Sequence, residues 1–563
     1  MNGWHKLIGR HNIHFGADIY YIRSNGFQNF PFGPEGGYLF GPGATASANG
    51  TGLGPYGSFA NSFAGFLLGT PTQQGRNLPA LTPSYSAWQA SGYLADTLKL
   101  TDRLTLDLGV RYDVFTPPYA RHSNGTFIFD PASNQLLPTG VNGVENNGNL
   151  DIRWNNVSPR IGIAYRPMER TVIRAGYGIN YFEGPLNFYA SSLLSNFGLA
   201  SGGFGTGFAT AGTLNQLPSV TSLTTASSSP IPAPNSPLVF SPKNMRTPYV
   251  QNFDFLIQHD LGRYGLIASV GYSGNLGREL PYSLEANAAA PGTGVTGQPF
   301  NNGPFARTAS TIERLTGLTS NYNSLQANLT KRFSQSLSFT AAYTYSRALD
   351  YGAGGLNPLL NNLNVRSNYG PADWDRTHMF TLSHVWRLPI GADSPFFHEG
   401  ILGKILGPWQ LDGLLSWVSG TPFTLTADPT LCNCPGNTPT ASAIVTGTST
   451  GFVPVPTVFG LLPVPYQALN FAYTQPPAGT LGNLGRNSVR GPGFTTYNVS
   501  LFRSFVLHEQ IRLEFRGEAY NLTNSPHFAN PISNVSSANF GQSVNTLSFD
   551  PGRRLQVAAR ILF

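Results

Sequence analysis

The sequence predicts an all-β fold: a transmembrane antiparallel β-barrel with long extracellular loops. Composition is the first observation, since 11% of the 563 residues are charged while 12% are aromatic. Such a surface suits a wall shared between lipid and a water-filled lumen. Second, no run reaches the roughly 18 apolar residues of a membrane-spanning helix. Because only helices and closed barrels satisfy every backbone polar group in hydrocarbon, a chain like this can span a bilayer only as a barrel.

The third observation is the alternation of apolar and polar residues, clearest at 103–112, 337–346 and 511–520. Segments of roughly ten to twelve residues fit a tilted membrane strand, whereas soluble strands average about five or six. The pattern predicts about 16 strands, an even number, as bacterial barrels have. They are expected at 11–22, 60–70, 75–84, 88–100, 103–115, 158–167, 171–182, 249–260, 265–274, 321–333, 337–347, 377–388, 408–426, 495–506, 510–522 and 553–563.

Short and long connections between these strands mostly take turns from residue 100 onward. The short ones are 100–102, 167–170, 261–264, 334–336 and 507–509, and the long ones are 116–157, 183–248, 274–320, 348–377 and 427–494. Outer-membrane barrels have short periplasmic turns and long external loops. The last predicted strand therefore runs toward the periplasm.

The C-terminal strand carries an apolar stripe that ends on the terminal aromatic residue. The stripe consists of Leu555, Val557, Ala559, Ile561 and Phe563. A soluble protein has no physical reason to end on an exposed Phe in its final strand. The stripe resembles the signal by which the barrel-assembly machinery recognises its substrates, so we predict that role for it.

A ladder of alternating charges lies on one face of the predicted strand 510–522. Its members are Arg512, Glu514, Arg516 and Glu518. We expect a lumen-wall network stabilised by cross-strand pairing. The alternative is that the ladder lines a substrate path.

Candidate chemical sites are few. Asp373, Asp375 and His378 could suggest a catalytic or metal site, but a loop-to-strand junction whose polar groups bond lumen neighbours is the favoured interpretation. Cys432 and Cys434 could form a local disulfide, although two unimportant thiols are favoured. We predict no enzymatic activity, no catalytic or metal-binding residues and no cofactor.

The formal net charge is +7, but no basic run or basic helix accompanies it, so nucleic acid is not an expected partner. The expected partners are outer-membrane lipid, lipopolysaccharide and the barrel-assembly machinery. The N-terminus shows no apolar signal-peptide region and no cleavage site.

Several stretches, taken in order, resemble the Oar-like branch of TonB-dependent outer-membrane receptors. They are 61–69 (NSFAGFLLG), 104–112 (LTLDLGVRY), 156–165 (NVSPRIGIAY), 171–177 (TVIRAGY), 322–332 (YNSLQANLTKR), 369–380 (YGPADWDRTHMF), 419–423 (SGTPF), 487–494 (NSVRGPGF) and 514–528 (EFRGEAYNLTNSPHF). The resemblance implies a barrel of about 22 strands filled by an N-terminal plug, and a short box that pairs with TonB. We therefore expect residues 1–563 to be one outer-membrane β-barrel domain that is N-terminally incomplete, without plug, TonB box or signal peptide.

The resemblance implies a receptor that imports a large or scarce ligand across the outer membrane of a Gram-negative-type bacterium. The TonB complex is then a partner only if a plug exists. The alternative is a passive porin-like channel or a surface adhesin, complete with about 16 strands. A secreted all-β enzyme or lectin is a third class.

Overall fold

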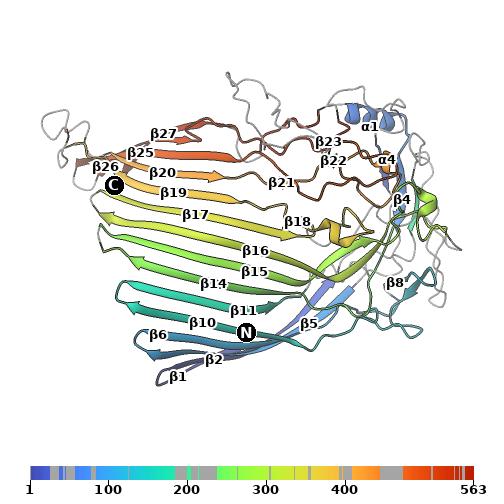
Figure 1. The fold of residues 1–563 in the computed structure, drawn as a ribbon, viewed down its shortest axis with the longest axis horizontal. Coiled ribbons are helices and arrows are strands. Elements are labelled where there is room, and N and C mark those ends of the chain that lie inside the picture. The colour runs from blue at the N-terminus through green and yellow to red at the C-terminus, as the bar shows by residue number, and fades with distance from the viewer. Residues whose placement is uncertain are drawn as a thin grey trace.

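The computed structural model of the chain is almost entirely β-structure (Figure 1). It describes residues 2–25, 37–41, 45, 57–77, 84–124, 126–183, 200–204, 214, 237–262, 264–302, 306–334, 336–352, 357–391, 396, 407, 409–443, 473–508, 511–537, 539–543, 545–547 and 552–563. Within these residues one large sheet has 18 strands. Three of them are short additions: β7 (Tyr119–Ala120), β13 (Leu238–Phe240) and β18 (Gly370–Pro371).

The other fifteen strands of this sheet follow one another in chain order, and each pairs antiparallel with the next. They are β1 (Asn2–Ile8), β2 (His11–Asn25), β5 (Ser84–Thr101), β6 (Leu104–Phe115), β10 (Asn156–Met168), β11 (Thr171–Tyr181), β14 (Tyr249–Asp260), β15 (Leu266–Glu285), β16 (Thr311–Ser334), β17 (Leu337–Asp350), β19 (His378–Arg387), β20 (Gln410–Val418), β25 (Phe494–His508), β26 (Ile511–Tyr520) and β27 (Arg554–Leu562). The predicted antiparallel all-β class is confirmed.

The remaining described elements lie in the connections. Small sheets join β3 (Gly37–Leu39), β4 (Gln73–Asn77) and β12 (Ala200–Phe204); β8 (Phe127–Asp130) and β9 (Gln135–Pro138); β21 (Pro422–Phe423) and β24 (Val489–Arg490); and β22 (Ser442–Ala443) and β23 (Tyr473–Thr474). The helices are α1 (Gly57–Leu67), α4 (Pro429–Cys432) and the 3-10 turns η3 (Val295–Gly297) and η4 (Val365–Asn368).

The two ends of the large sheet differ in their connections, as predicted. Short connections join β1 to β2, β5 to β6, β10 to β11, β14 to β15, β16 to β17 and β25 to β26 at one end of the sheet, which we call the turn end. Long connections and their small sheets and helices gather at the other, the loop end (Figure 1). The exception at this end is the pair β19 and β20, which a longer stretch of sequence joins. Gly9 has a φ of 56°, a left-handed conformation that glycine adopts without steric cost in a tight turn.

The strand register gathers apolar side chains on one face of the sheet, which we call the apolar face. Leu94 lies opposite Val110, and Leu108 lies opposite Ile161. These four side chains are between 45% and 53% exposed. An exposed band of this kind is unusual for a soluble monomer, whereas a barrel wall covered by lipid requires one.

Predicted and observed elements differ near the N-terminus. The predicted strand at 60–70 is wrong, because Gly57–Leu67 forms helix α1. Phe59, Phe63 and Phe66 recur there at helical spacing, and consecutive ring centroids are 6.2 Å apart. Of the predicted strand at 75–84, only the start is in β4, outside the large sheet, and 78–83 lie outside the described residues. Strand β1 was not predicted, because its short segment shows little alternation.

Two adjacent alanines near the middle of β17 test the assignment of faces. Ala341 is paired with Leu329 and Leu382 on the apolar face, and Ala342 with Asn328 and Thr381 on the polar face. We expect Ala341→Arg to lower the free energy of unfolding in lipid vesicles by about 2–4 kcal/mol, the cost of a midplane arginine. Ala342→Arg, the matched control, should cost far less. Equal losses in denaturant titrations would contradict the assignment.

Candidate functional site

Five charged residues from separate segments meet at the loop end. Arg486, with a side chain only 5% exposed, forms ion pairs with Asp350 at the end of β17 and, at 2.9 Å, with Asp373. Arg490 in β24 pairs with Asp375, whose side chain is 1% exposed. We call these five residues the loop junction. It ties the β17–β19 connection to the β20–β25 connection across more than one hundred residues of sequence.

Backbone contacts bring the same two connections together. The Arg486 Nε donates to the carbonyl of Asn368 at 2.9 Å. A Cβ at Gly370 would lie only 2.6 Å from the Arg486 carbonyl oxygen. A larger residue at this position would therefore push the two connections apart. Asn487, with a left-handed φ of 54°, donates its side-chain amide to the Pro371 carbonyl at 2.8 Å. The two backbones therefore meet at close range.

The predicted junction 373–378 divides between the two faces. Asp373 and Asp375 bond Arg486 and Arg490 of another connection at the loop end. His378 does not bond a lumen neighbour, because its Nδ1 lies 2.8 Å from the Tyr343 hydroxyl on the apolar face. That part of the interpretation is wrong, since the residue opens a strand whose alternation directs it outward. Among the described residues, no group of three His, Cys, Asp or Glu side chains could hold a metal ion.

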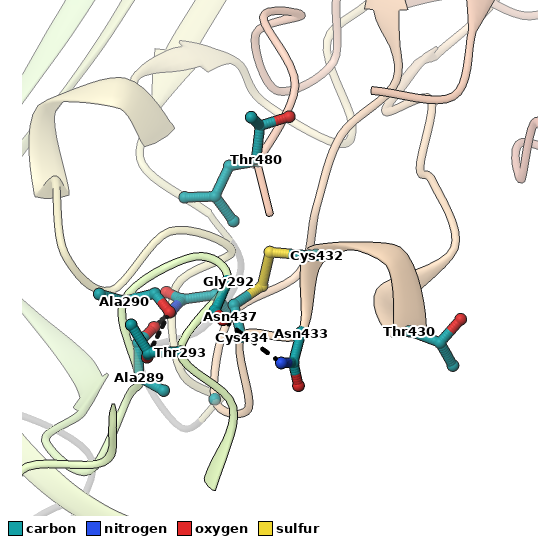
Figure 2. The surroundings of a disulfide bond; sticks show 12 residues. Ala289, Ala290, Gly292, Thr293, Thr430, Cys432, Asn433, Cys434, Asn437 and Thr480 are labelled. Carbon is teal, nitrogen blue, oxygen red and sulfur yellow. Dashed lines mark hydrogen bonds between the residues drawn. A yellow bond between two sulfur atoms is a disulfide. The ribbon is translucent and has the colours of Figure 1, made fainter. Parts of the chain in front are cut away.

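The two cysteines form a disulfide, so the interpretation as two free thiols is wrong (Figure 2). The turn that contains Cys432 and Cys434, together with the residues after it, is hydrogen-bonded to another connection. Gly292 donates its amide to the Cys432 carbonyl at 2.8 Å, and Asn437 donates its side-chain amide to the Ala289 carbonyl at 3.0 Å. Both cysteines are buried. The turn thus links the β15–β16 connection to the β20–β25 connection.

The predicted charge ladder lies on the polar face of β26. Arg516 contacts Glu514 at 3.2 Å and Glu518 at 3.5 Å, while Arg512, two residues closer to the turn end, is outside this ion-pair group. Glu518 also accepts a hydrogen bond from Tyr520 at 2.9 Å. The structure thus brings three of the four predicted residues together in one network. Its role in lining a ligand path stays a prediction.

The predicted C-terminal stripe continues the apolar face. Leu555, Val557, Ala559 and Ile561 lie opposite Ala519, Gly517, Phe515 and Leu513 of β26. Val557 is 86% exposed and Phe563, just beyond β27, is 97% exposed. Neither side chain contributes much to packing in this chain. A role as the barrel-assembly signal stays a prediction.

A second charged cluster, which the sequence reasoning missed, lies on the polar face toward the loop end. It lines a cavity of about 350 Å³ between β6, β10 and β11. Arg111 pairs with Asp113 at 2.8 Å and approaches Asp18 to 3.8 Å. Burial raises the pKa of Glu183, and a hydrogen bond from Gln89 opposes that shift. The alternation that places Arg111 and Asp113 on one face is the signal that could have found the pair.

The chain belongs to the family described as the outer membrane beta barrel domain, which matches residues 1–556. No curated protein matches the sequence. The fold is similar to that of the outer membrane transporter YddB from Escherichia coli, with 10% identity and a TM-score of 0.50 over 99% of this chain and 52% of that chain. This similarity concerns the fold.

Two further solved structures match with lower TM-scores. The FrpB iron transporter (F3-3 variant) from Neisseria meningitidis has 11% identity and a TM-score of 0.44 over 99% of this chain and 53% of that one. The siderophore receptor PiuA from Acinetobacter baumannii has 12% identity and a TM-score of 0.43 over 99% and 54%. The chain spans about half the length of the three structures.

The family confirms the predicted location in the Gram-negative outer membrane and the resemblance to receptor barrels at the level of the fold. The apolar face therefore meets lipid and the polar face lines the lumen. By the length rule for such barrels, the turn end is periplasmic and the loop end extracellular. Among the described residues, no helix is both long and apolar enough to cross a membrane.

Replacing one arginine in each group by alanine tests whether the loop junction contributes more to stability than the charge ladder on β26. We expect Arg486→Ala to weaken the closed loop arrangement by about 3–5 kcal/mol, because it leaves a buried carboxylate unpaired. Arg516→Ala removes two ion pairs as well, but its side chain is 41% exposed, so the loss should stay within about 1 kcal/mol. Native-state proteolysis of the loops measures both. Equal cleavage rates would show that the junction does not hold the loops.

Replacing the terminal residue tests the assembly signal. We expect Phe563→Ala to lower the amount of folded protein in the outer membrane of cells. Stability after refolding in vitro should change by less than about 0.5 kcal/mol, as at other exposed positions. Arg554→Ala, on the polar face of the same strand, is the control. Wild-type amounts of folded Phe563→Ala protein in cells, measured by heat-modifiable migration, would exclude the signal role.

Proposed function

We propose that this chain forms the β-barrel portion of a TonB-dependent outer-membrane receptor that takes up a large or scarce ligand. The main observation behind the proposal is that several connections at the loop end are bonded to one another. The loop junction and the disulfide turn tie together the β15–β16, β17–β19 and β20–β25 connections. A receptor gains affinity from a preformed surface, because loops that order only on binding cost binding free energy. A passive pore has no such need.

A concave site at this surface supports the same function. A cavity of about 230 Å³ lies between the β15–β16 and β17–β19 segments, lined in part by Tyr282, Tyr351, Leu359, Asp373 and Arg486. Aromatic walls with a few fixed polar groups are typical of ligand sites. Because Arg486 is held by two carboxylates, its guanidinium is already positioned when a ligand arrives.

The lumen wall offers a hydrated path below this surface. Its polar face presents the ladder on β26 and the Arg111 cluster on β6. Hydrophilic ligands such as chelates, oligosaccharides or peptides fit a wall of this polarity. Coupling to TonB rests on the family resemblance and requires a plug, which the receptor class supplies.

Energy dependence separates the receptor from a passive channel or adhesin. We compare a strain that lacks the gene with one that carries it in its natural reading frame, and follow medium components by mass spectrometry. The expected result is at least one compound of the three classes whose consumption requires the gene and stops when a protonophore collapses the proton-motive force.

The control is a solute taken up through general porins, whose entry across the outer membrane needs no TonB. Gene-dependent uptake that continues at the same rate in a strain lacking TonB would support the passive channel instead. Absence of any gene-dependent uptake, together with gene-dependent adhesion to surfaces, would support the adhesin.

A further inference from the structure

An aromatic and cationic patch lies on the lipid-facing side near the loop end. Its residues are Tyr343, Tyr345 and Arg347 of β17, His378 of β19 and Trp417 of β20, which we call the girdle patch. Tyr345 lies directly opposite His378. The side chains of Tyr345 and Trp417 are 51% and 43% exposed. The patch is therefore an accessible part of the wall and not a packed core.

The histidine ring is held in place from three sides. Its Nδ1 lies 2.8 Å from the Tyr343 hydroxyl. Its centroid is 5.2 Å from that of Tyr345 and 6.0 Å from that of Trp417, to which it is nearly parallel. With Nδ1 engaged, the Nε2 edge is the part of the ring left to meet a ligand.

The depth of the patch follows from strand length. Arg347 lies about ten residues from Leu337 at the turn end, the length that a tilted strand needs to cross the hydrocarbon. Trp386 lies opposite Leu337 at one end of this span, and Trp417, level in register with Tyr343, lies toward the other. Tryptophan favours the membrane–water interfaces. Arg347 is thus at the headgroup level of the outer leaflet.

Among the described residues of β16 to β20, no carboxylate on the apolar face balances the positive charge at this level. On the apolar face, the described register pairs of β16 to β20 include no Asp or Glu between the turn end and Arg347. The loop carboxylates Asp350, Asp373 and Asp375 are already paired with Arg486 and Arg490. Arg347 itself is exposed, and it is a diagonal neighbour of His378, at about 7–8 Å between Cα atoms.

We propose that the girdle patch binds the phosphate group of an outer-leaflet lipid. Arginine presents several N–H donors in the geometry that a phosphate accepts, and the imidazole edge adds another nitrogen. Tyr345, Trp417 and the neighbouring Leu325 offer an apolar surface for the upper part of the acyl chains. This site faces away from the lumen, so it is independent of the proposed uptake function.

The test uses the refolded full chain in detergent micelles, with diphosphoryl lipid A as the probe and its dephosphorylated form as the comparison. Native mass spectrometry gives the dissociation constant of each. We expect Arg347→Gln to weaken binding of the phosphorylated lipid about tenfold or more, the usual effect of losing a charged hydrogen bond. Arg174→Gln is the matched control, because Arg174 is also exposed but lies on the polar face.

A second variant, His378→Phe, keeps the ring stacking and removes the nitrogens, and it should also weaken binding. Heat-modifiable migration shows that each variant has folded. Equal binding by the Arg347 and Arg174 variants, or equal binding of the dephosphorylated lipid, would overturn the proposal. Displacement of the lipid by an equal concentration of inorganic phosphate would overturn it too, since that result indicates a site for free anions.

Discussion

Backbone hydrogen bonding in a solvent without water is the constraint on which this structure depends. Every peptide group within the hydrocarbon needs a partner, and fourteen consecutive antiparallel pairings supply partners on both sides of each main strand between β1 and β27. β1 and β27 lie at opposite margins of the sheet (Figure 1) and, among the described residues, are not paired with each other. Both run toward the turn end, so a direct pairing between them would be parallel, unlike the other fourteen.

The same constraint explains why order at the loop end has a different origin. Beyond the hydrocarbon, water competes for backbone groups, and long connections lose conformational entropy when they become ordered. Here charged side chains hold the long connections together. Arg486 bonds two carboxylates and three backbone carbonyls. In the disulfide turn, the Cys432 carbonyl accepts a hydrogen bond from Gly292 in the β15–β16 connection. Each of these contacts joins segments that the strands themselves leave apart.

How much of the structure could be predicted from the sequence depends on how far apart in the sequence the interacting residues lie. Residues 511–520 could be assigned because alternation and tight turns are local signals, and the structure has a strand over the same residues. Helix α1 could not be predicted in this way, because the spacing of its phenylalanines fits both a short strand and a helix until the neighbouring segments are known. Arg486 and Asp350 are 136 residues apart. No local pattern reports a contact of that kind, or whether Cys432 and Cys434 are close enough to bond.

Arginines on the polar face differ in their surroundings from Arg347 on the lipid face. On the polar face, Arg516 and Arg111 each contact two carboxylates, as expected for a wall that stays wet and near neutrality. On the lipid face, carboxylates are missing from the described register pairs around Arg347. An arginine at the headgroup level can extend toward phosphates, whereas a carboxylate there would be repelled by them. The proposed phosphate site would therefore account for the lack of carboxylates in the described pairs around Arg347.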